Sequence, residues 1–130
     1  MTAFMVSLLI IANPAAAKVR RAWPIVQREL KARGFEFDFH ETTKAGDATQ
    51  RTRSALRSGY RTIAVLGGDG TLSEVVEGFF EISEDLLDAP QSINPSASLA
   101  ALPAGTGEPP VVRLRSWTDA SSARTSLTSR

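Results

Sequence analysis

Five consecutive residues near the middle of the chain carry its clearest chemical signal: Gly67, Gly68, Asp69, Gly70 and Thr71. Glycine leaves the backbone N–H groups bare and permits a positive φ, so a phosphate chain can approach the main chain closely. A short apolar run precedes these residues, and the helical pattern that follows directs unpaired N–H groups and a positive dipole end to the same place. The combination predicts a nucleotide-phosphate site at the end of a parallel strand. Asp69 is suited to bind a ribose, a nucleotide edge or a Mg²⁺ ion.

The spacing of these glycines excludes the two commonest phosphate-binding motifs. The chain has no GxxxxGK[ST] sequence, so the segment is not a Walker-type loop, and GxGxxG is also absent. A plain strand–turn–helix junction also uses glycines, but an aspartate between them has no purpose that the turn alone requires. The string GGDGT resembles the signature shared by diacylglycerol and other lipid kinases, NAD kinases and phosphofructokinases.

Four segments in the right order make the chain similar to the diacylglycerol kinase catalytic domain. They read IIANP, TTKAGDA, LSEVVEG and LPAGTG, at residues 10–14, 42–48, 72–78 and 102–107. The family similarly opens with a strand that ends in Asn-Pro and later has Leu-Pro-x-Gly-Thr. An NAD kinase-like phosphotransferase would share GGDGT but neither of these flanks. It stays an alternative, as does a non-catalytic nucleotide-binding module or an inactive truncated product.

The chain departs from the family pattern at two places. Alanines occupy residues 15–17, where the family usually has a glycine, and alanine can accept a phosphate-facing turn only with negative φ. Glu-Pro-Pro follows Gly107, where the family has Asn-Asp and an apolar helix. Residues 108–130 have no helix or strand period and are rich in Ser, Thr and Arg, so we expect a divergent, disordered tail. Either a genuine short protein or a reading-frame shift after Gly107 would produce it.

Strand and helix patterns alternate along residues 1–107, which we therefore interpret as one nucleotide-binding domain. The alternation predicts βαβ units and an α/β fold with a doubly wound parallel sheet and helices on both faces. Relative to the family the fold would be incomplete, because a second, β-rich domain is absent. The expected strands span residues 4–12, 35–40, 62–66 and 99–102, and the expected helices run from about 24 to 33, 47 to 58 and 71 to 80.

Proline, glycine and aspartate mark the expected helix ends. Pro24 is expected in the first turn of the first helix, where its missing N–H costs nothing, and Gly34 is expected to be the C-cap of that helix. Asp47 is expected to cap the second helix and Gly59 to end it. His40 is expected to be an exposed strand residue rather than a catalytic base.

Composition and the length of the apolar run limit which partners and which cellular location the sequence predicts. The chain has 130 residues, no cysteine and a net charge of +1, which excludes a disulfide framework and predicts no nucleic-acid partner. The apolar run at residues 4–12 is shorter than the ~20 residues of a bilayer span. It also lacks the preceding positive charge of a secretory signal. We therefore expect no transmembrane segment and a cytoplasmic protein.

The family resemblance implies a ligand and a set of residues for the site. ATP with Mg²⁺ would bind beyond the carboxyl ends of the parallel strands. Intact relatives would transfer its γ-phosphate to a lipid hydroxyl, such as that of diacylglycerol, at the membrane surface. The general base and structural Mg²⁺ ligands would lie in the second domain, so no catalytic residue is named and the chain alone is expected to be inactive. The implied nucleotide-binding residues are Asn13, Thr42, Gly67, Gly68, Asp69, Gly70, Thr71, Glu74 and Thr106.

Overall fold

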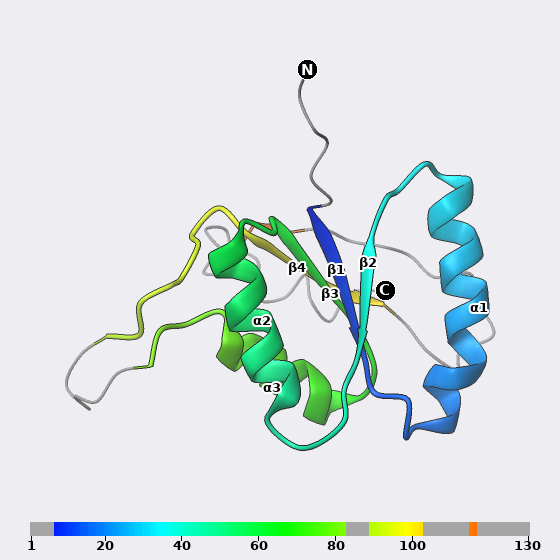
Figure 1. Cartoon of the computed structure of the whole chain (residues 1–130), viewed down its shortest axis with the longest axis horizontal. Helices are drawn as coiled ribbons and strands as arrows, with labels where there is room; N and C mark the ends of the chain where they lie inside the picture. Colours follow the sequence, from blue (N-terminus) through cyan, green and yellow to red (C-terminus); the bar gives the residue numbers. More distant parts are fainter. Residues whose placement is uncertain (1–6, 83–88, 103–114, 117–130) are drawn as a thin grey trace.

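The computed structural model describes residues 7–82, 89–102 and 115–116, in which strands and helices alternate (Figure 1). The elements in chain order are β1 (Leu8–Ala12), α1 (Ala17–Ala32), β2 (Asp38–Glu41), α2 (Asp47–Ser58), β3 (Thr62–Leu66), α3 (Asp69–Gly78), β4 (Ser98–Leu102) and β5 (Arg115–Ser116).

The strands form one sheet in the order β2-β1-β3-β4-β5. β1 is parallel to both β2 and β3, and β3 is parallel to β4, with Ile10 in register with Phe39 and Ala64. The chain first crosses from β1 to β2 on one side and then returns to β3 on the other side. The strand order therefore reverses between β1 and β3, which is where doubly wound sheets bind ligands. The predicted α/β fold with a doubly wound parallel sheet is confirmed.

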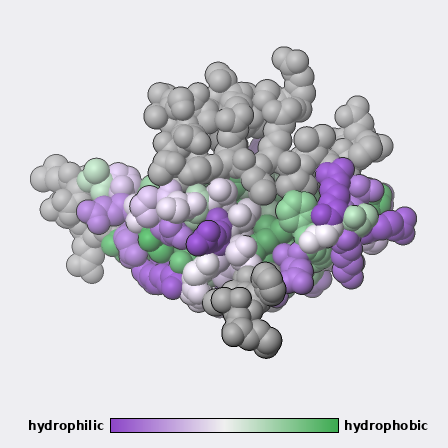
Figure 2. Space-filling view, turned by 90° about the horizontal axis from the view of Figure 1, so that it is seen from above, coloured by the Kyte–Doolittle hydropathy of each residue, from purple (hydrophilic) through white to green (hydrophobic). Residues whose placement is uncertain are grey.

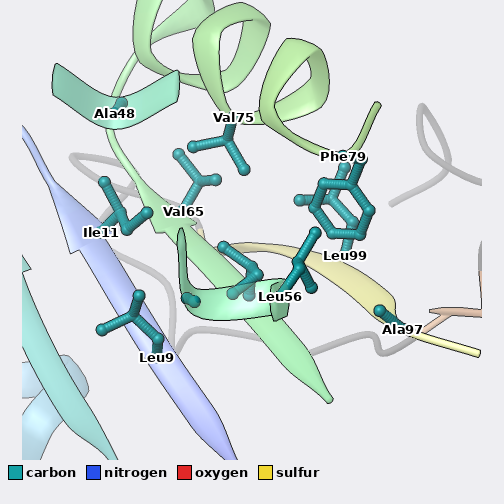
Figure 3. Packing of buried hydrophobic residues seen from close by; sticks show 11 residues of the cluster. Leu9, Ile11, Ala48, Leu56, Val65, Val75, Phe79, Ala97 and Leu99 are labelled. Atoms are coloured by element: carbon teal, nitrogen blue, oxygen red, sulfur yellow. The ribbon is translucent and has the colours of Figure 1, made fainter. Parts of the chain in front are cut away.

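Helices cover both faces of the sheet because successive strand side chains point to opposite faces. Leu9, Ile11 and Val65 belong to a buried cluster with residues of α2 and α3, including Leu56 and Val75 (Figure 3). The alternate residues of the same strands pack against α1 in a second cluster. All five residues of β1 are buried, so its apolar run follows from a sheet that is covered on both sides.

The first helix begins earlier than predicted. α1 begins at Ala17, and Pro24 lies inside it rather than in its first turn, so that prediction is wrong. The cause is Asn13, which turns the chain directly after β1: its Oδ1 accepts the Ala15 N–H at 3.0 Å and its carbonyl accepts the Ala16 N–H at 3.3 Å. Pro24 is exposed, so its ring is accommodated on the solvent side of α1.

The third helix also begins earlier than predicted, at Asp69 instead of Thr71. Gly68 is its N-cap in an extended conformation, and its carbonyl accepts the Leu72 N–H at 3.1 Å. Asp69, Gly70 and Thr71 therefore form the first helical turn. Within the described residues a positive φ occurs only at three other glycines, so the motif glycines do not use the positive φ that glycine permits.

Glycines with positive φ do shape the ends of the other helices. Gly59 ends α2 at φ +106°, so this predicted stop is confirmed. The C-cap of α1 is Arg33 rather than the expected Gly34, which follows it at φ +80°. The N-cap of α2 is Gly46 at φ +86°, not Asp47, which is the first helical residue. Because Gly46 fills the cap position, the Asp47 carboxylate is available to the loop before the helix.

Strand β2 begins later and is shorter than the predicted residues 35–40, because the Phe35 N–H still donates to the carbonyl oxygen of Leu30 in α1 at 3.0 Å. Phe39 is the only phenylalanine within the strand. It stacks on Trp23 of α1 with ring centroids 4.0 Å apart, and Phe37 meets the same ring edge-on at 5.8 Å. This aromatic contact ties α1 to the edge strand.

A short strand occurs where the sequence predicted none. Arg115–Ser116 pairs antiparallel with β4, through Ser98 with Ser116 and Leu99 with Arg115. The other residues of 108–130 lie outside the described residues, as do residues 4–6 of the predicted first strand. Among the described helices, none is both long and apolar enough to cross a membrane. Figure 2 looks onto the amino edge of the sheet and shows hydrophilic purple and hydrophobic green areas interspersed.

Candidate functional site

A pocket of about 380 Å³ lies at the carboxyl edge of the sheet. Its walls come from three connections: the segment after β1, the segment after β2 with the start of α2, and the first two turns of α3. In Figure 1 the first three strands point toward the lower edge of the picture, where each leads into its helix. The lining residues are Asn13, Pro14, Ala15, Thr42, Thr43, Lys44, Ala45, Ala48, Thr71 and Glu74.

Three helices begin around this pocket. The N-caps of α1, α2 and α3 are Ala16, Gly46 and Gly68, and none of these three residues has a side chain that caps its helix. The N–H groups of a first helical turn have no partner within the helix, and each helix carries partial positive charge at this end. Three such ends at one edge of the sheet favour an anionic ligand.

The structure brings four of the nine predicted residues together at the pocket: Asn13, Thr42, Thr71 and Glu74. Gly67 follows β3, and the next three residues, Gly68, Asp69 and Gly70, are exposed at the start of α3 without lining the pocket itself. Thr71 belongs both to the GGDGT motif and to the residues that line the pocket, and it is buried there. Thr106 lies outside the described residues.

Two of the motif glycines face open space. A Cβ atom placed on Gly68 or Gly70 would meet no atom of the described structure within 4 Å. A Cβ atom on Gly67, in contrast, would lie 3.2 Å from the Cβ atom of Thr71. Packing therefore explains the glycine at position 67, whereas positions 68 and 70 are open to the approach of a ligand.

Hydrogen bonds fix the loop between β2 and α2, which we define as residues 42–46. Thr42 donates its N–H to the carbonyl oxygen of Ala12 at 2.9 Å, and Thr43 donates its N–H to Asp47 Oδ2 at 2.9 Å. The Thr43 N–H, with smaller contributions from His40, lowers the pKa of Asp47 below its ordinary value. His40 Nε2 lies 3.1 Å from the same Oδ2 atom. His40 is thus half-buried and hydrogen-bonded, not the exposed residue that we expected.

Glu74 joins the 42–46 loop to α3. Its Oε1 accepts the Gly46 N–H at 3.0 Å, and its backbone carbonyl accepts the Thr49 Oγ1 hydroxyl at 2.8 Å. The two bonds connect residues 28 and 25 positions apart in the sequence. Glu74 therefore connects the wall of the pocket that α3 forms to the wall that the 42–46 loop and the start of α2 form.

Lys44 is a lining residue that the sequence analysis did not single out. It is exposed, and it is the one cationic side chain among the described residues that line the pocket. Lys44 could have been identified from its place in the TTKAGDA segment, which follows a predicted strand. A lysine at this position can meet a phosphate as a point charge.

The residues described here do not form a metal site by themselves. No group of three or more His, Cys, Asp or Glu side chains in the described part of the chain could hold a metal ion. Mg²⁺ is commonly held by one or two carboxylates together with substrate phosphates. The described carboxylates near the pocket thus fit Mg²⁺ only as an ion that arrives with a phosphate ligand.

These features define an α/β domain with a doubly wound sheet and a pocket at its switch point. The family model of the diacylglycerol kinase catalytic domain matches residues 7–129. The chain belongs to this family, which selects the lipid-kinase interpretation of GGDGT over the NAD kinase-like alternative.

Individual relatives agree with the family. The chain is 45% identical over 74 residues to the diacylglycerol kinase of Staphylococcus carnosus (strain TM300), covering 55% of this chain and 24% of that protein. It is 42% identical over 74 residues to the diacylglycerol kinase of Staphylococcus haemolyticus (strain JCSC1435), covering 55% of this chain and 22% of that protein. The chain thus spans about a quarter of the length of the curated relatives that it matches.

The fold resembles a solved diacylglycerol kinase structure from Bacillus anthracis str. Sterne. The TM-score is 0.51 and the sequence identity 27%, over 78% of this chain and 34% of that chain. A second structure from the same organism gives a TM-score of 0.55 at 26% identity, over 78% of this chain and 31% of that chain.

Proposed function

We propose that the pocket at the carboxyl edge of the sheet binds ATP, and that the chain is the nucleotide-binding part of a diacylglycerol kinase. The observation that carries this proposal is the convergence of Asn13, Thr42, Thr71 and Glu74 on one pocket beside the GGDGT motif. These residues come from three separate connections, and the family membership independently favours a phosphate-transferring kinase.

The charges around the pocket suit a triphosphate. Three helix N-termini and Lys44 supply positive potential, while the open faces of Gly68 and Gly70 allow phosphate oxygens to reach backbone N–H groups. The Thr71 and Thr42 hydroxyls supply further donors. Asp69 is an anion at the start of α3, so it would face a ribose hydroxyl or a Mg²⁺ ion that the phosphates carry.

The reaction proposed for a protein of the family's full length is phosphoryl transfer from ATP to a lipid hydroxyl at the membrane surface. The bond between the γ-phosphorus and the β–γ bridging oxygen breaks, and a bond from the γ-phosphorus to the lipid oxygen forms. Such reactions depend on positioning and charge stabilisation, and the residues named here bind and orient the phosphates. The base that accepts the hydroxyl proton is not assigned to a residue of this chain. For these 130 residues alone we predict nucleotide binding without lipid phosphorylation, and a cytoplasmic location stays a prediction.

Titration calorimetry with ATP and Mg²⁺ tests the proposal. The unsubstituted chain should bind ATP, and Asp69→Ala should abolish binding while the far-ultraviolet circular dichroism spectrum stays unchanged, because the carboxylate is exposed and packs against little. Glu36→Ala is the matched control, since Glu36 is exposed in the connection between α1 and β2. Equal affinity of all three proteins for ATP would refute the assignment of Asp69, and no binding by any of them would refute the nucleotide site.

A further inference from the structure

The 42–46 loop and α3 form facing walls of the pocket, and a side-chain hydrogen bond joins them. Glu74 lines the pocket, and its Oε1 accepts the Gly46 N–H at 3.0 Å. The φ of +86° at Gly46 turns the backbone so that the N–H of this residue is presented to α3. The bond is partly buried, where a charge-assisted hydrogen bond is stronger than in open water.

Other hydrogen bonds of the loop are local and involve the first residue of α2. Thr43 is bonded to Asp47, and the Asp47 N–H in turn donates to the Lys44 carbonyl oxygen at 3.2 Å. These contacts stay within residues 43–47, so they fix the shape of the loop but not its distance from α3. The Thr49 hydroxyl holds α2 to the Glu74 carbonyl, and the Glu74 carboxylate joins the end of the loop itself to α3, so it contributes to the position of Lys44 at the pocket.

We propose that Glu74 is a positioning residue that holds the 42–46 loop against α3, so that the loop is already in place when the phosphates bind. This inference rests on the proposed ATP site and assigns Glu74 a role through the loop rather than on the ligand. The Glu74 carboxylate accepts one backbone N–H, so the length of the side chain should matter more for holding the loop than its negative charge.

Two conservative substitutions separate the effect of side-chain length at position 74 from the effect of its negative charge. Glu74→Gln keeps an oxygen at the same distance from Gly46 and removes the negative charge. Glu74→Asp keeps the charge and withdraws the oxygen by one methylene group. The matched control is Glu77→Asp, because Glu77 lies on the same helix with an exposed side chain.

Hydrogen exchange of the Gly46 amide, measured without nucleotide, reports on the contact directly. We expect exchange about tenfold faster in Glu74→Asp, since losing a bond to a charged group corresponds to about one order of magnitude. Exchange should be at most about threefold faster in Glu74→Gln, which keeps the bond without its charge, and near-unchanged in Glu77→Asp. The exchange of buried β1 and β3 amides should not change in any variant. Unchanged exchange of Gly46 in Glu74→Asp would overturn the proposal.

The affinity for ATP, measured by calorimetry on the same proteins, decides between positioning and direct contact. The affinity should fall about tenfold in Glu74→Asp and stay within about threefold in Glu74→Gln. A loss in Glu74→Gln that equals or exceeds the loss in Glu74→Asp would show that the charge acts on the ligand and would overturn the positioning role. If the unsubstituted chain bound no ATP, the proposed function would fail, and Gly46 exchange would still decide whether Glu74 holds the loop.

Discussion

Gly78 of α3 approaches Thr52 of α2 so closely that a Cβ atom on the glycine would lie 2.6 Å from the Cβ atom of the threonine. The same Cβ atom would be 2.7 Å from the backbone oxygen of Thr49. The two helices that cover one face of the sheet therefore make close contact where Gly78 meets Thr52 and Thr49. Because Thr49 also donates to the carbonyl of Glu74, this crossing fixes where α3 presents its pocket residues.

Replacing Gly78 by alanine should destabilise the fold, because the new methyl group meets backbone and a buried side chain that cannot move aside. Overpacking of this kind costs about 1–3 kcal/mol. The matched control is Gly70→Ala in the same helix, where the Cβ atom meets open space and alanine's higher helix propensity should add up to about 1 kcal/mol. Urea unfolding measures both, and equal stability of the two variants would contradict the close crossing.

The Asp47 carboxylate should make stability depend on pH in the acid range. Its pKa is lowered in the folded state, chiefly by the Thr43 N–H. The ionised group therefore stabilises the fold above its unfolded pKa of about 4, and this contribution is lost as the pH falls through the folded-state pKa. Asp47→Asn keeps an acceptor for Thr43 but removes the charge. The difference in unfolding free energy between the two proteins should be present at pH 7 and shrink below about pH 4. A difference that stays constant down to pH 2 would contradict this role, and Glu41→Gln on the exposed edge strand serves as the control.

Lys44 should contribute to the affinity for ATP through its charge. A unit charge near a phosphate at an exposed site is worth about 1 kcal/mol or more, so Lys44→Met should weaken ATP binding at least about fivefold. AMP, which carries less charge, should lose less, and added salt should reduce the difference for ATP. Lys31→Met, in the last turn of α1, is the control. The same affinity for ATP in Lys44→Met and Lys31→Met would show that Lys44 does not face the phosphates.

The sheet and the helix ends could be predicted from sequence because their signals are local. The apolar runs of β1 and β3 follow from burial on both faces, and the span predicted for β3 is the observed one, Thr62–Leu66. Gly59 and Gly34 are the positions where a left-handed backbone ends a helix. Four pocket residues could be predicted from the family resemblance, and three of them, Asn13, Thr42 and Thr71, also follow a strand end or lie in the first turn of α3.

The helix starts and the pocket walls could not be predicted in the same way. α1 begins early because the Asn13 side chain turns the chain, and no apolar period signals such a turn. α3 begins early because Gly68 is an extended cap rather than part of a loop. The contact between Glu74 and Gly46 joins residues 28 positions apart, so it depends on how α2 and α3 pack. Lys44 became a candidate only when the pocket showed which loop residues line it.

The most direct test of the central claim, that nucleotide phosphates bind at the carboxyl edge of the sheet, is an amide NMR titration of the isotope-labelled chain with ATP and Mg²⁺. We predict saturable shifts at the amides of Gly68, Gly70 and Thr43, and unchanged amides at Gly59 and Arg61, which lie just before β3 at the opposite edge. Shifts confined to the opposite edge, or no saturable shifts at millimolar ATP, would contradict the account.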